Sequence, residues 1–194
     1  MTTSIPGYRL GDPALPPSTI DLAGLERLKA SLLLGPDDIA ALRRAGEILG
    51  PQVEDVLDVW YGFVGSNEFL LRYFSTPSGP DAAYLSAVRA RFGQWIRDTC
   101  AAAYDATWLA WQKEIGRRHF RAKNETDGAK GTPPFVHFRY VNSLIYPIYA
   151  TVRPFLAKGG ASDVEVEAMH QAWLKAVILQ VTLWARAYLP ADAW

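Results

Sequence analysis

Apolar residues recur every three or four positions through most of this 194-residue chain, and no segment sustains an alternation of apolar and polar residues. A spacing of three and four places side chains on one face of an α-helix, whereas a half-buried strand needs a period of two. Proline and glycine interrupt the pattern at Gly35-Pro36, Gly50-Pro51 and Thr76–Pro80, where helices are expected to end. The chain is therefore predicted to be all-α, with about eight helices.

The positions of proline and glycine also predict the domain organisation. Residues 1–20 are rich in proline and glycine and lack periodicity, which predicts an extended N-terminal arm, and residues 21–194 are expected to form a single domain. Helices are expected to start near Asp21, Pro36, Pro51, Glu68, Asp81 and Asp105, and the two longest to run from Pro133 to about Lys158 and from Ser162 to about Leu189. Pro147 should kink the first of these two.

Charge and cysteine content exclude several classes of protein. Twenty basic and twenty acidic side chains cancel, and no Lys/Arg block stands apart, so neither a nucleic acid nor an anionic membrane surface is an expected partner. No signal peptide or membrane-spanning run is evident. Cys100 is the only cysteine, which excludes an intrachain disulfide and favours the reducing cytoplasm. We expect Cys100 itself to be a small buried hydrophobic residue.

The two long C-terminal helices are apolar on more faces than the surface helix of a monomer needs. The residues concerned are Phe138, Val141, Leu144, Ile145, Ile148 and Tyr149 on the first, and Val177, Ile178, Leu179, Val181, Leu183 and Trp184 on the second. A second subunit would cover the extra face, which predicts a homodimer through these helices. The alternative is that other helices of the same domain bury them completely.

One histidine ends an apolar stripe. Trp108, Trp111, Ile115 and His119 are separated by steps of three, four and four residues, so the imidazole points inward. Most inward histidines are core residues satisfied by a carbonyl group, and the helix alone does not distinguish that role from a metal ligand. His119, His137 and His170 lack the close spacing of a zinc site.

Three aromatic residues are candidates for a wall facing His119. Trp60 and Tyr61 lie side by side on one predicted helix, and Phe92 lies on the next long one. Together they offer a single phenol and no histidine. A neutral imidazole opposite an apolar wall with one hydrogen-bond donor is the arrangement that a five-coordinate haem needs.

Several motifs carry a resemblance to a known family. They are IPGY (residues 5–8), LDVWYGFVGS (57–66), VRARFGQWIRDTC (88–100), EIGRRHF (114–120), IYPIYATVRPFLA (145–157) and QAWLKAVILQV (171–181). In this order, over essentially the whole chain, they resemble protoglobin, the single-domain relative of globin-coupled sensors. The resemblance implies a globin fold enlarged by a leading helix and by an N-terminal arm that wraps the haem, with a dimer formed by the last two long helices.

The resemblance also implies roles for individual residues. His119 matches the proximal iron ligand, Trp60 and Tyr61 the distal pair, and Phe92 the distal-helix residue beside them. Arg91 matches a residue that pairs with a haem propionate. The remaining residues expected around the haem are Val64, Val88, Leu144 and Ile148 on the distal side, with Phe74 and Ile115 as further cofactor contacts.

Two positions depart from the family pattern. Phe120 stands where a second histidine often follows the proximal one, which puts the role of that neighbour in doubt. Leu144 stands where a phenylalanine is expected near the haem, and the smaller side chain would widen the cavity.

The function that this resemblance implies is reversible binding of O2, CO or NO at ferrous haem b (iron protoporphyrin IX), with Tyr61 as hydrogen-bond donor and Trp60 as a steric gate. One alternative is a haem-dependent redox enzyme with peroxidase, nitrite or NO, or carbene-transfer chemistry. A second is a gas sensor that acts through a separate partner, because the chain ends at Trp194 soon after the last helix. A third is a helical protein without a cofactor.

Overall fold

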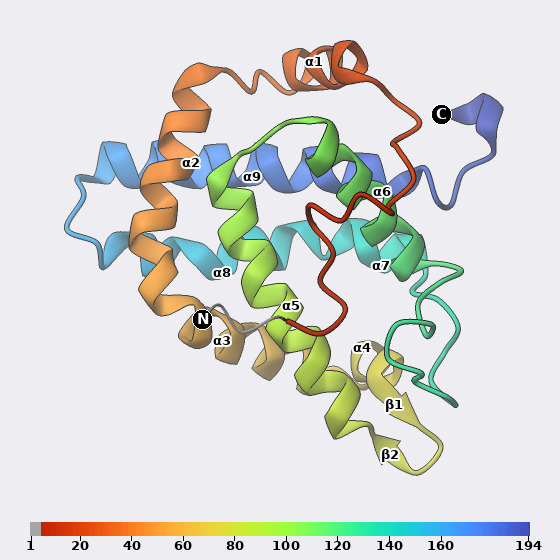
Figure 1. Cartoon of the computed structure of the whole chain (residues 1–194). Helices are drawn as coiled ribbons and strands as arrows, with labels where there is room; N and C mark the ends of the chain where they lie inside the picture. The colour runs from red at the N-terminus through yellow and green to blue at the C-terminus, as the bar shows by residue number, and fades with distance from the viewer. Residues whose placement is uncertain (1–4) are drawn as a thin grey trace.

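The computed structural model describes residues 5–194, so residues 1–4 of the predicted arm lie outside the described part. Its α-helices are α1 (Leu22–Ser31), α2 (Pro36–Leu49), α3 (Val53–Gly65), α4 (Glu68–Leu71), α5 (Ala82–Ala101), α6 (Ala106–His119), α7 (Phe138–Ser143), α8 (Ile145–Ala157) and α9 (Asp163–Ala185). Three short 3-10 helices are η1 (Gly50–Gln52), η2 (Arg72–Phe74) and η3 (Ala191–Ala193). The all-α prediction is confirmed (Figure 1).

A small hairpin joins η2 to α5. Its strands, β1 (Ser75–Thr76) and β2 (Gly79–Pro80), are antiparallel, with Ser75 opposite Pro80 and Thr76 opposite Gly79. The sequence predicted a loop here, and the pairing closes that loop without adding a β-layer. It is the only sheet within residues 5–194.

Acidic residues begin two of the helices that form the site described below. The side chains of Asp81 and Asp105 accept hydrogen bonds from the backbone N–H groups of Tyr84, at 3.0 Å, and Trp108, at 2.7 Å. Each bond satisfies an N–H group that has no partner inside the helix. The starts of α5 and α6 therefore agree with those predicted from the sequence.

The predicted helix from Pro133 to Lys158 is wrong in two respects. It begins only at Phe138, because Pro133 and Pro134 have no N–H to donate and disfavour helical conformation in the residue before them. It is also interrupted at Leu144, which separates α7 from α8. Pro147 lies in the first turn of α8. Proline has no N–H group, so it cannot donate to the carbonyl oxygen of Ser143 at the end of α7, and its position at the start of a helix is a favourable one. The second long helix, α9, ends at Ala185, four residues before the predicted Leu189.

Helices α8 and α9 lie side by side through the middle of the molecule, and α2 and α5 cross them (Figure 1). Helix α9 forms the centre of the core, since it contacts α2, α5, α6 and α8. Its Ala172 and Leu179 have no exposed surface, and Trp173 is 1% exposed. From Ala172 to Ala185 no residue of this helix is exposed, because neighbouring helices surround it.

The burial of α9 bears on the predicted dimer. Val177, Val181 and Leu183, which suggested a second subunit, are 1%, 4% and 6% exposed within the single chain. On α8, by contrast, Tyr146 is 71% exposed and Ile145 is half-buried. Contacts within one chain therefore bury most of the apolar surface of α9, and the dimer stays a prediction.

The arm crosses α5 and α6 before the chain enters α1 (Figure 1). Residues 5–20 contain turns but neither helix nor strand. The Tyr8 ring packs edge-on against Trp111 of α6 with centroids 5.1 Å apart, and its hydroxyl donates to the Asp98 carboxylate of α5. The arm is thereby attached to both helices.

Cys100 is 2% exposed on α5, and burial raises the pKa of its thiol to about 12. This agrees with its expected role as a small buried hydrophobic residue. Within residues 5–194, no helix combines the length and apolar character that crossing a membrane requires. The cytoplasmic location stays a prediction.

Candidate functional site

A cavity of about 260 Å³ opens between α3, α5, α6 and α9. It is lined by all the site residues predicted from the sequence, which are Trp60, Tyr61, Val64, Phe74, Val88, Arg91, Phe92, Ile115, His119, Leu144 and Ile148. The helices bring these side chains together from positions up to 88 residues apart, Trp60 being the first and Ile148 the last. Their individual roles stay predictions.

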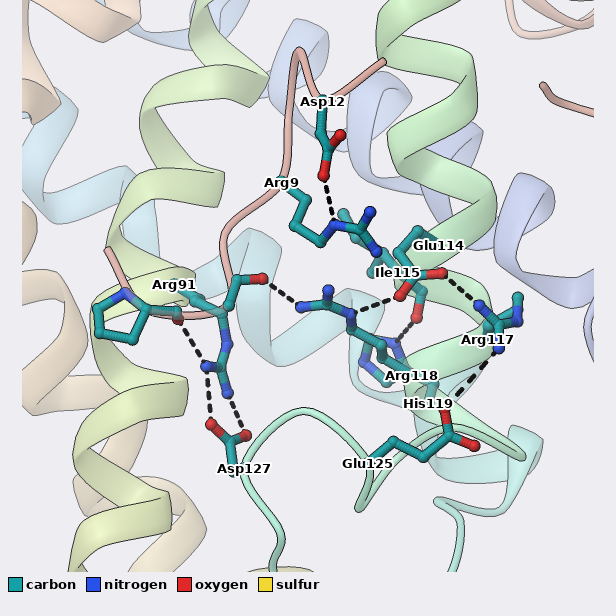
Figure 2. A network of polar contacts seen from close by, with 12 residues as sticks. Arg9, Asp12, Arg91, Glu114, Ile115, Arg117, Arg118, His119, Glu125 and Asp127 are labelled. Carbon is teal, nitrogen blue, oxygen red and sulfur yellow. Dashed lines mark hydrogen bonds and ion pairs between the residues drawn. The ribbon is translucent and has the colours of Figure 1, made fainter. Parts of the chain in front are cut away.

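His119 is the last residue of α6 and turns one ring nitrogen toward the helix. Its Nδ1 lies 3.0 Å from the carbonyl oxygen of Ile115, one turn earlier, and donates to it (Figure 2). This bond places the proton on Nδ1 and leaves the Nε2 lone pair free. Burial lowers the pKa of the imidazole, so the ring is held neutral. A neutral imidazole with a free Nε2 at a cavity wall can ligate a metal.

The backbone of His119 is held as firmly as its ring. Its carbonyl oxygen accepts a hydrogen bond from the N–H of Val136 at 2.8 Å. The Tyr188 hydroxyl lies 2.8 Å from the same oxygen and 2.8 Å from the carbonyl oxygen of Val136, and donates its proton to one of them at a time. These contacts satisfy the free carbonyl at the end of α6 and fix the histidine in place.

Trp184 of α9 supports the imidazole from one side. The two rings are stacked with centroids 4.9 Å apart and planes inclined by 17°. The Trp184 Nε1–H donates to Oε1 of Gln112 at 2.9 Å, which orients the indole. A Cβ atom on Gly116 would lie 3.0 Å from Cα of Trp184, so the glycine allows α6 and α9 to approach closely enough for this stacking.

Aromatic rings form the opposite wall. Phe92 of α5 meets the ring of Trp60 at a centroid distance of 5.7 Å and that of Tyr61 at 6.4 Å, both edge-on. Neither the Trp60 indole N–H nor the Tyr61 hydroxyl has a hydrogen-bond partner among residues 5–194, although both residues line the cavity. Loss of solvent raises the pKa of Tyr61, which keeps its phenol protonated. The wall thus contains two side-chain donors that have no partner among residues 5–194.

Three cationic side chains stand along the cavity lining, and the first is Arg91 of α5. Its guanidinium binds the Asp127 carboxylate through two hydrogen bonds of 3.0 and 2.5 Å, and Nη1 donates to the carbonyl oxygen of Pro6 at 2.9 Å (Figure 2). Both partners of the ion pair have side chains that are 13% exposed. The expected partner of Arg91 was a haem propionate, and in this structure the acidic group beside it is Asp127.

The other two cations are Arg118 and Lys123. Arg118 donates to Glu114 at 2.9 Å and to the carbonyl oxygen of Gly7 at 2.5 Å, so it also holds the arm (Figure 2). Lys123 is 5% exposed, and its Nζ donates to Oδ1 of Asn124 at 3.0 Å and to Oγ1 of Thr132 at 3.1 Å. Burial lowers the pKa of Lys123 to about 8.

These features fit a planar, largely apolar cofactor that carries a metal and acidic groups. The free Nε2 of His119 suits the metal, the aromatic wall suits an apolar face, and the cations suit carboxylates. Within residues 5–194, no group of three or more His, Cys, Asp or Glu side chains is arranged to hold a metal ion.

Sequence reasoning missed four residues that matter here, Arg118, Lys123, Tyr8 and Trp184. For Arg118 a signal existed, because it follows Trp111 by seven positions and Ile115 by three and so continues their helical face. The others reach the cavity from the arm, from the loop after α6 and from α9. No local pattern joins those segments to His119.

The family model described as Protoglobin matches residues 21–194. Among solved structures, the chain is similar to the globin domain of the Geobacter sulfurreducens globin-coupled sensor, with a TM-score of 0.64 and 16% identity over 85% of this chain and 97% of that one. At 16% identity, the similarity to the Geobacter sulfurreducens domain concerns the fold alone. A search of curated proteins finds no match.

Proposed function

Because the chain belongs to the protoglobin family of haem globins, we propose that its cavity holds haem b, with His119 as the proximal ligand, and that it binds O2, CO or NO reversibly. When bound, haem supplies four porphyrin nitrogens and an iron with a position for a diatomic gas. The protein supplies the fifth ligand, the shape of the gas pocket and the anchors for the propionates.

The observation that carries the proposal is the environment of His119. Its Nδ1 donates to the carbonyl oxygen of Ile115 at 3.0 Å, its pKa is lowered by burial, and its ring stacks on Trp184. In a histidine that is only part of the core, both ring nitrogens normally have hydrogen-bond partners, whereas Nε2 of His119, beside the cavity, has none among residues 5–194. A proximal ligand needs this tautomer and this fixed orientation.

The distal residues have distinct roles in the proposal. The Tyr61 hydroxyl donates a hydrogen bond to a polar guest, because it lines the cavity without a protein partner and stays protonated. The Trp60 indole, 8% exposed, limits the space beside it, and Phe92 holds both rings from the edge. A largely apolar wall with only these two donors favours binding of a small, weakly polar gas while excluding water.

The cations along the lining hold the propionates in the same proposal. Arg91 and Arg118 each present a guanidinium at the cavity, and Lys123 adds a primary amine. Lys123 forms no ion pair within residues 5–194, so it is the cation with the most to gain from a carboxylate. When a propionate binds to Arg91, the Asp127 carboxylate either stays paired with the same guanidinium or moves away from it.

The structure favours ligand binding over turnover. The cavity lining holds one histidine, His119, and one carboxylate, Asp127, among residues 5–194, and Asp127 pairs with Arg91. Cleavage of peroxide calls for a general acid and base on the gas side, where the donors are Tyr61 and Trp60. A haem-dependent redox enzyme is therefore the weaker proposal.

The proposed function is tested by titrating the purified protein with haemin, reducing it and adding CO or O2 in turn. One haem per chain is expected, and the reduced spectrum should be five-coordinate, shift with each gas and recover when the gas is removed. A protein that takes up no haem, or whose reduced form is already six-coordinate without gas, contradicts the proposal.

We also propose that the protein is a homodimer through α8 and α9. The supporting observation is the apolar surface left on α8, where Tyr146 is 71% exposed beside the half-buried Ile145. In light scattering, Tyr146→Glu should shift the protein toward the monomer. Leu33→Glu is the control, because Leu33 is 79% exposed in the turn after α1. A wild-type protein of monomeric mass contradicts the dimer.

A further inference from the structure

A second cavity, of about 220 Å³, lies on the other face of α6. From this helix it is lined by Leu109, Lys113 and Arg117, which are spaced by four residues and so share one face. Ile115 and His119 line the first cavity. Ile115 follows Lys113, and His119 follows Arg117, by two positions, which is a rotation of roughly 200° about the helix axis. The two cavities are therefore separated by the helix itself.

The polar part of this second cavity is positively charged. Lys113, Arg117 and Arg186 line it, and its lining contains no Asp or Glu side chain. Arg117 forms an ion pair with Glu114, whose Oε2 accepts from its Nη1 at 2.6 Å and whose Oε1 accepts from Arg118. The other two cations lack such a partner among the described residues.

Lys113 and Arg186 donate hydrogen bonds to backbone carbonyl groups and not to carboxylates. The Nζ of Lys113 donates to the carbonyl oxygen of Pro17 at 2.8 Å, and Nη1 of Arg186 donates to that of Leu189 at 3.2 Å. Carbonyl oxygens orient a cation without cancelling its charge. Two cationic side chains are thus held at one cavity by backbone groups, with no carboxylate within ion-pair distance among the described residues.

The rest of the lining is apolar. Leu109 and Leu183 are 2% and 6% exposed, and Ile20 and Trp194 complete the apolar part from the two ends of the chain. The volume corresponds to about seven waters at roughly 30 Å³ each. Such a space admits a short hydrocarbon chain or one aromatic ring, with its charged end at the cations.

We propose that this second cavity is a binding site for a small organic carboxylate with an apolar tail, held by Lys113 and Arg186. The carboxylate replaces the backbone carbonyls or shares the cations with them, which gives charge-assisted hydrogen bonds. The tail lies against Ile20 and Trp194, which are only partly buried, and displaces water from their apolar surface. The site is separate from the His119 cavity and does not depend on the gas-binding proposal.

The test is calorimetric titration of the full chain with octanoate and, separately, with indole-3-acetate. At least one of them is expected to bind at one site per chain in both the haem-free and the haem-loaded protein. In Lys113→Gln/Arg186→Gln that affinity should fall at least about tenfold, since two charged hydrogen-bond donors are lost. Octan-1-ol, which has the tail without the charge, should bind equally to wild type and variant.

A charge-matched control is Arg43→Gln/Arg44→Gln, which removes two cations from the exposed face of α2 and should retain wild-type affinity. Circular dichroism checks that each variant is folded, and the single variant Arg186→Gln, expected to show an intermediate loss, replaces the double one if that fails to fold. Failure of both carboxylates to bind wild type overturns the proposal. Equal affinity in the wild type and the variant, as expected for binding in the His119 cavity, overturns it as well.

Discussion

The imidazole of His119 lies nearly parallel to the indole of Trp184, with ring centroids 4.9 Å apart and planes inclined by 17°. The stacking depends on how closely α6 and α9 approach each other, and Gly116 is the residue that permits the approach. The orientation of the proposed haem ligand is therefore coupled to the packing of two core helices.

Gly116→Ala should destabilise the protein by about 1–3 kcal/mol, because the new Cβ would lie 3.0 Å from Cα of Trp184 and 3.1 Å from its carbonyl oxygen. Gly62→Ala in α3 is the control, since a Cβ there meets nothing within 4 Å. It should stabilise the helix by up to roughly 1 kcal/mol. Urea unfolding measures both, and a neutral or stabilising Gly116→Ala would show that the helices have room to spare.

Tyr61→Phe should speed the dissociation of O2 from the haem-loaded protein and leave CO dissociation almost unchanged. The Tyr61 hydroxyl lines the cavity without a protein partner, and O2 gains more than CO from a hydrogen bond because it is more polar when bound. For a hydrogen bond worth about 1 kcal/mol the rate should rise roughly fivefold. Stopped-flow measurement of both gases provides the internal control. An unchanged O2 rate would remove Tyr61 from the set of donors.

Arg118→Ala should release the N-terminal arm. Arg118 donates to the carbonyl oxygen of Gly7, so its loss should expose the peptide bond after Arg9 to trypsin. Arg117→Ala is the control, because Arg117 shares Glu114 with Arg118 but donates no hydrogen bond to residues 5–20. Time-resolved proteolysis with mass spectrometry should show faster cleavage at Arg9 only in the first variant. Equal cleavage rates would mean that Arg91 and Tyr8 hold the arm without it.

Lys123 should make the stability of the protein depend on pH in an identifiable window. Burial lowers its pKa to about 8 from the ordinary 10.5, so between these values the unfolded chain binds a proton that the folded protein has released. Lys123 therefore destabilises the fold below pH 8, and this cost is relieved as the pH rises toward 10.5. In haem-free protein, Lys123→Met should reduce the rise in unfolding free energy between pH 8 and pH 10 relative to wild type.

Lys158→Met, at an exposed position after α8, serves as the control for this pH dependence and should keep the wild-type slope. Urea unfolding at half-unit pH intervals gives the slopes. Equal slopes for wild type and Lys123→Met would show that Lys123 keeps its proton in the folded state.

The sequence predicted those parts of the fold that depend on neighbouring residues. Asp81 and Asp105 begin their helices as expected, because N-capping involves a residue and the N–H three positions later. The predicted start of a helix at Pro133 was wrong, because apolar periodicity was extended across two prolines that cannot donate helical hydrogen bonds. Local rules work where the competing interactions are also local.

The cavity residues were predicted better than their partners. Trp60, Tyr61, Phe92 and His119 were identified by periodicity and resemblance, and the structure brings them to one cavity. The contact of Arg118 with Gly7 joins residues 111 positions apart, and no spacing in the sequence indicates such a pair. The burial of α9 by the chain's own helices was likewise a property of the assembled core.

The most direct test of the central claim is the visible spectrum of haem-reconstituted, reduced His119→Gly with and without added imidazole. Without imidazole, the variant should lose the five-coordinate histidine spectrum. When imidazole fills the vacated space, the spectrum and the CO response should return to those of wild type. His170→Ala, which alters a histidine bonded to the Tyr149 carbonyl away from the cavity, should keep the wild-type spectrum. A His119→Gly spectrum identical to wild type without imidazole would contradict the assignment of His119 as the ligand.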